Sequence, residues 1–87
     1  MDTKAYVYIL ECNDHTYYTG YTTDVENRLK MHNLGRGAKY TRARRPCRLV
    51  YSKACDSKSS AMKLEYKIKQ LSRKEKVDLI LGVLKEF

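Results

Sequence analysis

The stretch AYVYILECNDHTYYTGY, residues 5–21, decides the fold of this 87-residue chain. Two runs within it, residues 5–11 and 16–21, are rich in Tyr, Val, Ile and Thr, which suit a pleated strand. Between these runs, Asn13 and Asp14 are typical of a turn. The stretch therefore predicts an antiparallel β-hairpin.

Tyrosine stands out in this hairpin, and it accounts for eight of the 87 residues. In strand periodicity Tyr6 and Tyr8 share one face of their strand, and Tyr18 and Gly20 share one face of the next. Gly20 has no side chain, so it leaves space beside Tyr18. A phenol can pack a core and also present a polar, titratable tip. Tyr8 and Tyr18 are thus either sheet aromatics that pack against a helix or parts of a site.

The following segment predicts a helix and a third strand. A capping box at residues 23–26 starts the helix, which ends at Asn33 before the glycines of residues 35–37. Residues 39–46 are expected to form a loop or a short helical turn. Residues 48–54 have the composition of a strand.

Two further helices complete the pattern. Ser57, or Asp56 before it, begins the first, and a capping box at residues 72–75 opens the second. Apolar residues at helical spacing predict their inward faces. These residues are Ala61, Leu64, Ile68 and Leu71 in the first helix, and Val77, Ile80, Leu81 and Leu84 in the second.

These elements indicate an α/β (α+β) fold class with the element order β-β-α-β-α-α. Because three strands cannot bury a sheet face unaided, the small three-stranded antiparallel sheet should be flanked by the three helices. A chain of this length has room for one modest core, so residues 1–87 are expected to form a single domain. A monomer is assumed.

Composition narrows the class of protein. No stretch is long enough to cross a bilayer, and the N-terminus lacks the basic-then-apolar layout of a signal peptide. Cys12, Cys47 and Cys55 include no Cys-x-x-Cys pair, which favours reduced, buried thiols. A zinc site from Cys12, His15 and another cysteine is a weaker alternative. We expect a soluble, cytoplasmic protein.

The net charge of +8 is concentrated in the middle of the chain. No Asp or Glu interrupts residues 28–54, and arginine outnumbers lysine there. Such a run gathers phosphates by charge and counterion release, although a solubilising surface is the alternative. We expect nucleic acid as the partner, DNA before RNA, and neither a membrane nor a small-molecule cofactor. The expected contact residues are Arg36, Lys39, Arg42, Arg44 and Arg45.

Arg28 and His32 are four residues apart, so they are neighbours on one face of the predicted helix. The planar guanidinium of Arg28 could hold a scissile phosphate. His32 could be a general acid or base, because the pKa of histidine suits that work. The alternative for His32 is a histidine that interacts favourably with the helix C-terminus.

Glu65 lies nearly on the apolar stripe of its helix, where a carboxylate needs a partner. A hard cation would satisfy it, and so would a salt bridge to Arg28 or Lys69. Mg²⁺ keeps several waters and takes one or two protein carboxylates, so a lone Glu is compatible with Mg²⁺ or Mn²⁺. The order Tyr, Tyr, Arg, His, Glu therefore indicates a metal-assisted phosphodiester hydrolase.

The chain resembles the GIY-YIG nuclease superfamily, above all its short stand-alone bacterial members of the YhbQ/YazA type. Tyr-Val-Tyr at residues 6–8 stands where the family has Gly-Ile-Tyr, and Tyr-Thr-Gly at residues 18–20 stands where it has Tyr-Ile-Gly. The resemblance extends to about Leu71. It includes the run Gly-Arg-Gly-Ala-Lys-Tyr-Thr at residues 35–41.

The resemblance implies a metal-dependent endonuclease that hydrolyses DNA phosphodiester bonds, in DNA repair or in the processing of branched or damaged DNA. Tyr18 or Tyr8 would be the general base toward the attacking water. Arg28 would neutralise developing charge, and His32 would assist as a hydrogen-bond partner or proton relay. Glu65 would hold the Mg²⁺ or Mn²⁺ ion.

Two departures from the family pattern motivate an alternative, a catalytically weak or inactive nucleic-acid-binding module. Tyr6 replaces the first glycine, and no asparagine follows Glu65. In a nuclease, the polar tips of the five candidate residues should converge on one solvent-open concavity bordered by residues 39–45. Glu65 should then lie close to Arg28 or face water.

Overall fold

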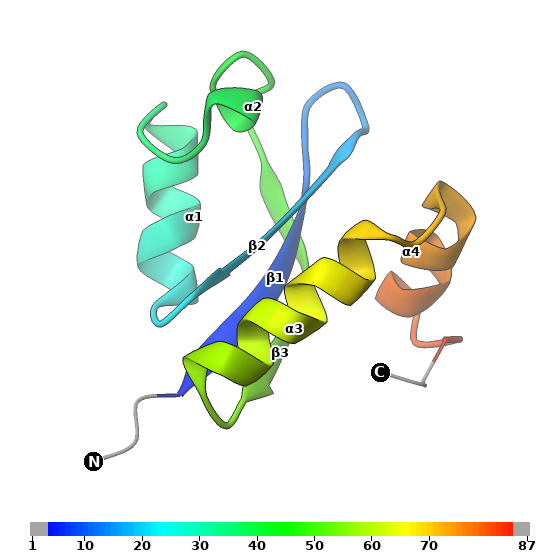
Figure 1. Cartoon of the computed structure of the whole chain (residues 1–87). Helices are drawn as coiled ribbons and strands as arrows, with labels where there is room; N and C mark the ends of the chain where they lie inside the picture. The colour runs from blue at the N-terminus through cyan, green and yellow to red at the C-terminus, as the bar shows by residue number, and fades with distance from the viewer. Residues whose placement is uncertain (1–3, 85–87) are drawn as a thin grey trace.

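A computed structural model of the chain describes residues 4–84, with a sheet and helices in the predicted order β-β-α-β-α-α (Figure 1). The elements are β1 (Ala5–Glu11), β2 (Tyr17–Thr22), α1 (Val25–Asn33), α2 (Lys39–Arg42), β3 (Arg48–Cys55), α3 (Lys58–Lys69) and α4 (Arg73–Ile80). The α2 helix is the short helical turn expected after α1. The predicted fold class and element order are confirmed.

The sheet is antiparallel throughout, with the strand order β2-β1-β3. In the hairpin register Tyr8 pairs with Gly20, and Leu10 pairs with Tyr18. Because side chains alternate between the faces of a strand, Tyr8 and Tyr18 project from the same face. Their ring centres lie 6.4 Å apart.

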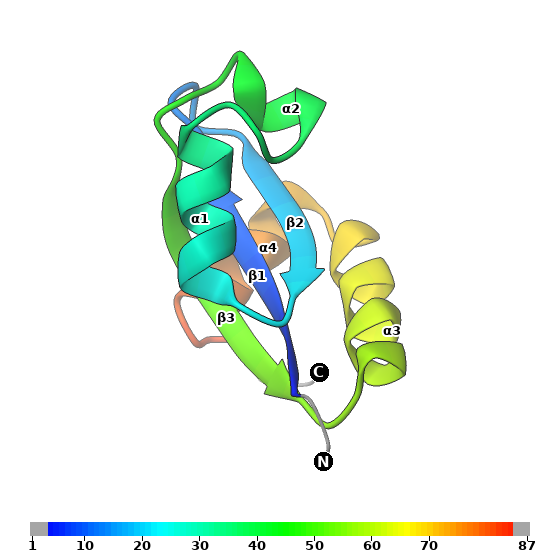
Figure 2. The same ribbon diagram turned by 90° about the vertical axis from the view of Figure 1, so that its left-hand side faces the viewer.

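The two faces of the sheet are covered by different helices. Val7 and Ile9 pack in one apolar cluster with α3 and α4, and Leu10 packs in a second cluster with Leu29 of α1. Figure 2 shows α1 and α3 on either side of β2. Since β2 is an edge strand, side chains of both helices can meet beyond it.

The helix starts follow the predicted chemistry with one correction. The capping box predicted at residues 23–26 is wrong, because the N-cap of α1 is Asp24, which accepts a hydrogen bond from Asn27 N at 3.1 Å without a reciprocal bond. Ser57, rather than Asp56, caps α3. The capping box of α4 is confirmed, with Ser72 and Glu75 bonded reciprocally.

The inward face of α4 differs from the predicted one at Leu81, which is 69% exposed. The helix ends at Ile80, and Gly82 follows with a φ of 80°, so Leu81 lies at the helix end rather than on its packed face. Leu79 is the buried residue of α4. The set of inward residues predicted from the apolar spacing did not include it.

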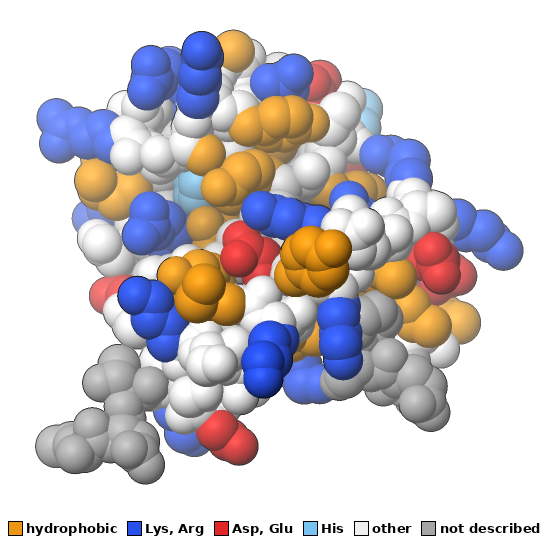
Figure 3. Space-filling model, in the orientation of Figure 1, with side chains coloured by type: hydrophobic (Ala, Val, Ile, Leu, Met, Phe, Trp, Pro, Cys, Tyr) orange, Lys and Arg blue, Asp and Glu red, His pale blue; other side chains and the backbone are white. Residues whose placement is uncertain are grey.

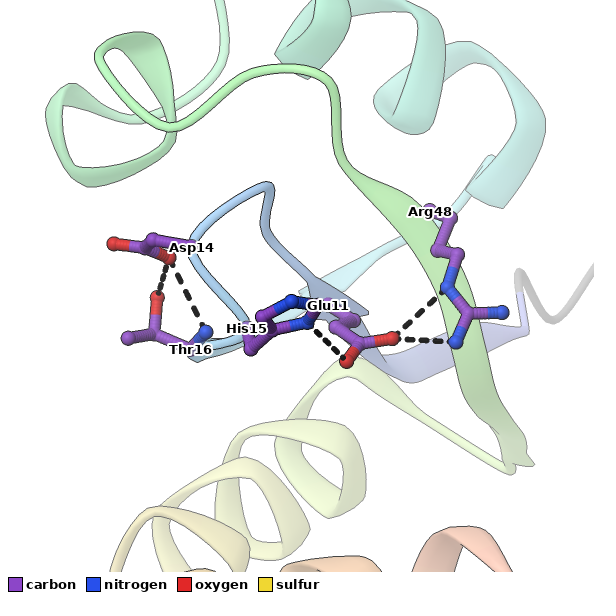
Figure 4. A network of polar contacts seen from close by, with 5 residues as sticks. All are labelled: Glu11, Asp14, His15, Thr16 and Arg48. Carbon is purple, nitrogen blue, oxygen red and sulfur yellow. Dashed lines mark hydrogen bonds and ion pairs between the residues drawn. The ribbon is translucent and has the colours of Figure 1, made fainter.

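Polar contacts at the end of the hairpin position the start of β2 and β3 (Figure 4). Asp14 accepts hydrogen bonds from the backbone N–H and the hydroxyl of Thr16, which holds Thr16 in the turn and starts β2 one residue later than predicted. Glu11 contacts His15 at 3.4 Å and accepts a 2.9 Å hydrogen bond from Arg48 Nε. These contacts join the turn to β3.

The cysteines do not assemble a zinc site. Cys12 and Cys47 are buried thiols with their sulfur atoms 3.7 Å apart, whereas His15 contacts Glu11 instead. Over residues 4–84 no group of three or more His, Cys, Asp or Glu side chains could hold a metal ion. The same residues include no helix with the length and apolar character needed to span a membrane.

Candidate active site

A hollow of about 460 Å³ opens beside the edge strand β2. Its walls come from β1, β2, the loop after β2, α1 and α3. The residues that line it are Tyr8, Tyr18, Gly20, Tyr21, Thr22, Thr23, Arg28, Lys58 and Glu65. Four of the five candidate catalytic and metal-binding residues therefore meet in one place.

Glu65 and Tyr18 reach this hollow from different layers. The α3 helix packs on the face of the sheet that carries Val7 and Ile9, which is opposite the face of Tyr8 and Tyr18. Glu65 nevertheless lines the same hollow as Tyr18, because the hollow lies at the edge of the sheet where β2 ends the layer. Tyr8, Tyr18 and Glu65 thus share one hollow, and their roles in catalysis and metal binding stay predictions.

Gly20 makes room for the hydroxyl of Tyr8. A Cβ atom at residue 20 would lie 2.6 Å from Tyr8 Oη and 2.8 Å from Cζ. The two residues are direct partners across the hairpin, so the phenol lies over the glycine. The sequence predicted that this space adjoins Tyr18, but Tyr8 occupies it.

His32 lies behind the hollow rather than in it. Its side chain is buried with 1% exposure, its Nε2 lies 2.8 Å from Tyr8 Oη, and its Nδ1 lies 2.8 Å from Thr41 Oγ1. The expectation that all five polar tips reach one open concavity is wrong for His32, because the ring completes the core between α1, α2 and the sheet. Because His32 does not line the hollow, it can act on a substrate only indirectly, through its hydrogen bond to Tyr8.

Burial shifts the pKa values of this pair in opposite directions. Burial raises the pKa of Tyr8 above its usual value, and Tyr18 and Glu65 add to the rise while Arg28 opposes it. Burial also lowers the pKa of His32, and the charge of Arg28 adds to that effect. Because the pKa of Tyr8 is raised and that of His32 is lowered, both groups are neutral near pH 7.

Glu65 has the environment of a carboxylate that can accept a cation. Its side chain is 19% exposed, lines the hollow, and forms a 3.2 Å ion pair with Lys69 rather than with Arg28. Tyr8 and Tyr18, whose side chains end in hydroxyl groups, line the same hollow together with Arg28 and Lys58. One carboxylate with oxygen neighbours and open solvent fits Mg²⁺ or Mn²⁺, which keep most of their water ligands.

The basic segment reaches the site differently from the prediction. Residues 39–45 contribute nothing to the lining of the hollow, so they do not border it as expected. Tyr40 stacks on Tyr18 with ring centres 6.0 Å apart, and Thr41 bonds His32. The segment therefore supports the two site residues from behind.

Two arginines of this segment, Arg44 and Arg45, make contacts within the protein. Arg44 donates to Asp14 and to the carbonyl of Tyr40, and its guanidinium lies 3.9 Å from the centre of the Tyr40 ring. Arg45 donates from Nε to the carbonyl of Arg42 at 2.8 Å. Arg44 and Arg45 therefore carry structural contacts in addition to charge.

Arg36, Lys39 and Arg42 are exposed, and their side chains make no hydrogen bond or ion pair within residues 4–84. Figure 3 shows lysine and arginine side chains spread over one face of the molecule among hydrophobic ones, with fewer acidic side chains. These three residues are the side chains of the predicted set that are most available to a phosphate backbone.

Three contributors to the site escaped the sequence interpretation. Lys58, in the first turn of α3, lines the hollow and adds a second cation to that of Arg28. Thr41 is fully buried against His32. A Cβ atom at Gly37 would lie 2.2 Å from His32 Nδ1, so the glycine makes room for the ring. A buried polar ring needs partners, but the burial of His32 is visible only in the structure, so no signal in the sequence points to Thr41 or Gly37.

Tyr6, which replaces the first glycine of the family motif, does not enter the hollow. It pairs with Thr22 across the hairpin and lines a separate depression with Thr23, Asp24 and Ser52. The replacement therefore leaves the candidate active site open.

Comparisons with known proteins agree with this geometry. Residues 4–78 match the GIY-YIG catalytic domain. A UPF0213 protein of Halobacterium salinarum is 61% identical over 71 residues, which cover 82% of this chain and 92% of that protein. A UPF0213 protein of Staphylococcus haemolyticus is 56% identical over 77 residues, which cover 88% of this chain and 94% of that protein.

Two solved structures are also similar. The solution structure of a UPF0213 protein from Bacillus halodurans is 57% identical, with a TM-score of 0.58 over 88% of this chain and 82% of that chain. The solution structure of a protein from E. faecalis is 37% identical, with a TM-score of 0.63 over 100% of this chain and 95% of that chain. From the domain match and these identities, the chain belongs to the GIY-YIG family, among its short UPF0213 members.

Proposed function

We propose that this protein is a metal-dependent endonuclease that hydrolyses DNA phosphodiester bonds, in DNA repair or in the processing of branched or damaged DNA. The observation that carries the proposal is the meeting of Tyr8, Tyr18, Arg28 and Glu65 in one hollow, with His32 bonded behind Tyr8. Family membership supports the nuclease chemistry. Mg²⁺ or Mn²⁺ as the ion, the cytoplasmic location and the monomeric state stay predictions from the sequence.

Tyr8 is the tyrosine that we favour as general base. Its hydroxyl lies 2.8 Å from His32 Nε2, so it can pass its own proton to His32 while it takes one from the attacking water. The raised pKa of Tyr8 and the lowered pKa of His32 both oppose this transfer. The charge of Arg28 eases the loss of the Tyr8 proton but makes His32 a weaker proton acceptor. Tyr18 lines the same hollow and can orient the water or the phosphate.

Arg28 and Lys58 would hold the substrate. The guanidinium of Arg28 can donate two parallel hydrogen bonds to phosphate oxygens and neutralise the charge that develops on them. Lys58 adds a second positive charge in the same hollow. Glu65 would bind the divalent cation, which, when bound, polarises the phosphate and stabilises the leaving oxygen.

Cleavage assays test the proposal. Purified protein is incubated with supercoiled plasmid, a flap duplex and a single-stranded oligonucleotide in Mg²⁺, in Mn²⁺ or with a chelator. We expect metal-dependent cleavage that falls about 10²-fold or more in Glu65→Gln, because the carboxylate ligand is lost. Glu26→Gln, at an exposed carboxylate of α1, is the matched control and should cleave normally. Wild-type cleavage no faster than that of Glu65→Gln, on every substrate and with either ion, would overturn the proposal.

The second candidate function is a nucleic-acid-binding module with weak or absent catalysis. The ion pair of Glu65 with Lys69 favours it, because a carboxylate that already has a partner gains less from a cation. This function predicts tight, salt-dependent binding without turnover. Catalysis and binding are thus separated by the cleavage assay above and a binding titration.

Charge reversal of the exposed basic residues tests the binding surface. Arg36→Glu combined with Arg42→Glu should weaken DNA binding. The slope of the logarithm of the binding constant against the logarithm of the salt concentration should become shallower by about one for each lost phosphate contact. The combination Lys63→Glu and Lys67→Glu places the same charge change on exposed residues of α3 as a control. Equal affinities for the two double variants would count against the predicted surface.

A further inference from the structure

His32 belongs to a series of hydrogen bonds that runs from Tyr8 to the backbone carbonyl of Ala38, the residue before α2. Tyr8 Oη lies 2.8 Å from His32 Nε2, and His32 Nδ1 lies 2.8 Å from Thr41 Oγ1. The Thr41 hydroxyl in turn donates to the carbonyl oxygen of Ala38 at 3.0 Å. His32 and Thr41 are essentially excluded from solvent, with 1% and 0% exposure, and Tyr8 is 3% exposed.

The hydrogen bond from Thr41 to Ala38 determines which atom donates in the other two hydrogen bonds. A carbonyl oxygen cannot donate, so the single proton of the Thr41 hydroxyl lies between Thr41 and Ala38. The contact between Thr41 and His32 then needs its proton from Nδ1. A neutral imidazole with a proton on Nδ1 has a lone pair on Nε2, so Tyr8 donates to His32 rather than the reverse.

The opposite arrangement would be unfavourable at residue 41. With the proton of His32 on Nε2, the Thr41 hydroxyl would have to donate to Nδ1, and its oxygen would face the Ala38 carbonyl 3.0 Å away with no proton between them. No solvent reaches Thr41 to relieve this contact. The Ala38 carbonyl would keep its hydrogen bond from Arg42 N, but two acceptor oxygens held 3.0 Å apart with no proton between them in a buried place cost free energy.

We propose that Thr41 is a positioning residue that fixes His32 in the tautomer with the proton on Nδ1, so that a lone pair on Nε2 always faces the Tyr8 hydroxyl. The consequence for catalysis rests on the proposed nuclease function, in which the Tyr8 proton passes to Nε2. The tautomer itself is a property of the folded chain and does not rest on that function. Thr41 touches neither the hollow nor a substrate, and it acts through His32.

The surrounding sequence supports this role for α2. Tyr40 stacks on Tyr18 and Thr41 bonds His32, so neighbouring residues of one short helix brace two site side chains. Gly37 leaves the space that the His32 ring occupies. The run at residues 37–41 therefore builds the rear wall of the site, although none of it lines the hollow.

Nuclear magnetic resonance of ¹⁵N-histidine-labelled protein tests the tautomer directly. Long-range proton–nitrogen correlations distinguish a protonated ring nitrogen from one with a lone pair. In wild-type protein near pH 7 we expect the protonated signal at Nδ1 of His32 and the lone-pair signal at Nε2. His15 in the same spectrum, exposed on the hairpin turn, is the internal comparison. A wild-type His32 protonated on Nε2 would overturn the inference, whether or not the protein cleaves DNA.

Two substitutions separate positioning from packing. Thr41→Val keeps the volume but removes the hydroxyl, so we expect a mixture of tautomers or a shift to Nε2, and a loss of about 10- to 100-fold in kcat with KM unchanged. Thr41→Ser keeps the hydroxyl and removes a methyl group, so the wild-type tautomer and a nearly normal kcat should return. Thermal unfolding of both variants shows whether each is folded.

These experiments can refute the role of Thr41 independently of the proposed nuclease function. A Thr41→Val protein that keeps the wild-type tautomer, or a Thr41→Ser protein that loses kcat as Thr41→Val does, would overturn the positioning role. If the wild-type protein cleaves no DNA, the proposed function fails, and the three spectra still decide the inference. If Thr41→Val does not fold, the wild-type and Thr41→Ser spectra decide it.

Discussion

Gly37→Ala should destabilise the protein through contact with one ring. A Cβ atom at residue 37 would lie 2.2 Å from His32 Nδ1 and 2.6 Å from Cγ. The backbone there is not left-handed, so alanine is compatible with the local conformation. The ring has nowhere to move, because it is buried and bonded to Tyr8 and Thr41. The substitution therefore forces the ring out of its hydrogen bonds.

The size of the effect follows from the contacts that are lost. Each of the two buried hydrogen bonds of His32 contributes a net of about 1 kcal/mol, and overpacking of a filled core costs about 1–3 kcal/mol. We expect the free energy of unfolding to fall by about 3–5 kcal/mol. In a domain of this size each kcal/mol lowers Tm by about 4–8 °C, so the expected decrease in Tm is roughly 12–40 °C.

Urea denaturation monitored by circular dichroism measures this loss of stability. A double-mutant cycle with His32→Ala then shows whether the loss comes from the clash with the His32 ring. In a His32→Ala background the clashing ring is absent, so Gly37→Ala should cost almost nothing. Gly82→Ala is the control: a Cβ there meets nothing within 4 Å, but its φ of 80° should cost about 1–2 kcal/mol in either background. A Gly37→Ala loss below about 0.5 kcal/mol, or an unchanged loss in the His32→Ala background, would refute the reasoning.

Three further predictions follow from the site and its supports. Arg28→Gln should lower kcat about 10²- to 10³-fold by removing a phosphate donor, and Lys30→Gln on the same helix should not. Because burial lowers the pKa of His32, the unfolded chain binds that proton more tightly, so the free energy of unfolding should fall as the pH drops below about 6.5. This slope, measured by urea titrations from pH 7 to 5, should disappear in His32→Asn. Ser57→Ala should remove the N-cap of α3 and cost about 1 kcal/mol in thermal or urea unfolding, and no loss would contradict the capping assignment.

The hairpin could be predicted from the sequence because its information is local. Strand composition and the turn at Asn13 and Asp14 place β1 within its observed bounds and β2 within one residue of them. Alternation along each strand then puts Tyr8 and Tyr18 on one face, as the register confirms. Glu65 was recognisable for a similar reason, since a carboxylate near an apolar stripe stands out from its own helix.

The support of the site could not be predicted, because it depends on contacts between distant segments. Nothing local in the run that contains Thr41 indicates that its hydroxyl meets a histidine on the preceding helix. The charge of Arg44 suggested nucleic acid, yet its guanidinium contacts Asp14 thirty residues earlier. His32 was assigned to an open site for the same reason, because helical spacing gives the face of a residue and not the depth at which that face is buried.

The division of the sheet into two faces explains how a small protein can keep a polar site in its interior. Val7 and Ile9 lie in the larger apolar cluster, against α3 and α4, and this cluster contributes most of the hydrophobic stabilisation. The other face has a smaller cluster around Leu10, and there the buried pair of Tyr8 and His32 takes the place of further apolar residues. Each polar atom of that pair has a partner, so the face avoids the cost of unpaired groups. Substitutions that break these hydrogen bonds should therefore disturb the site while the larger apolar cluster on the opposite face stays folded. Mild substitutions should reduce activity without unfolding the protein.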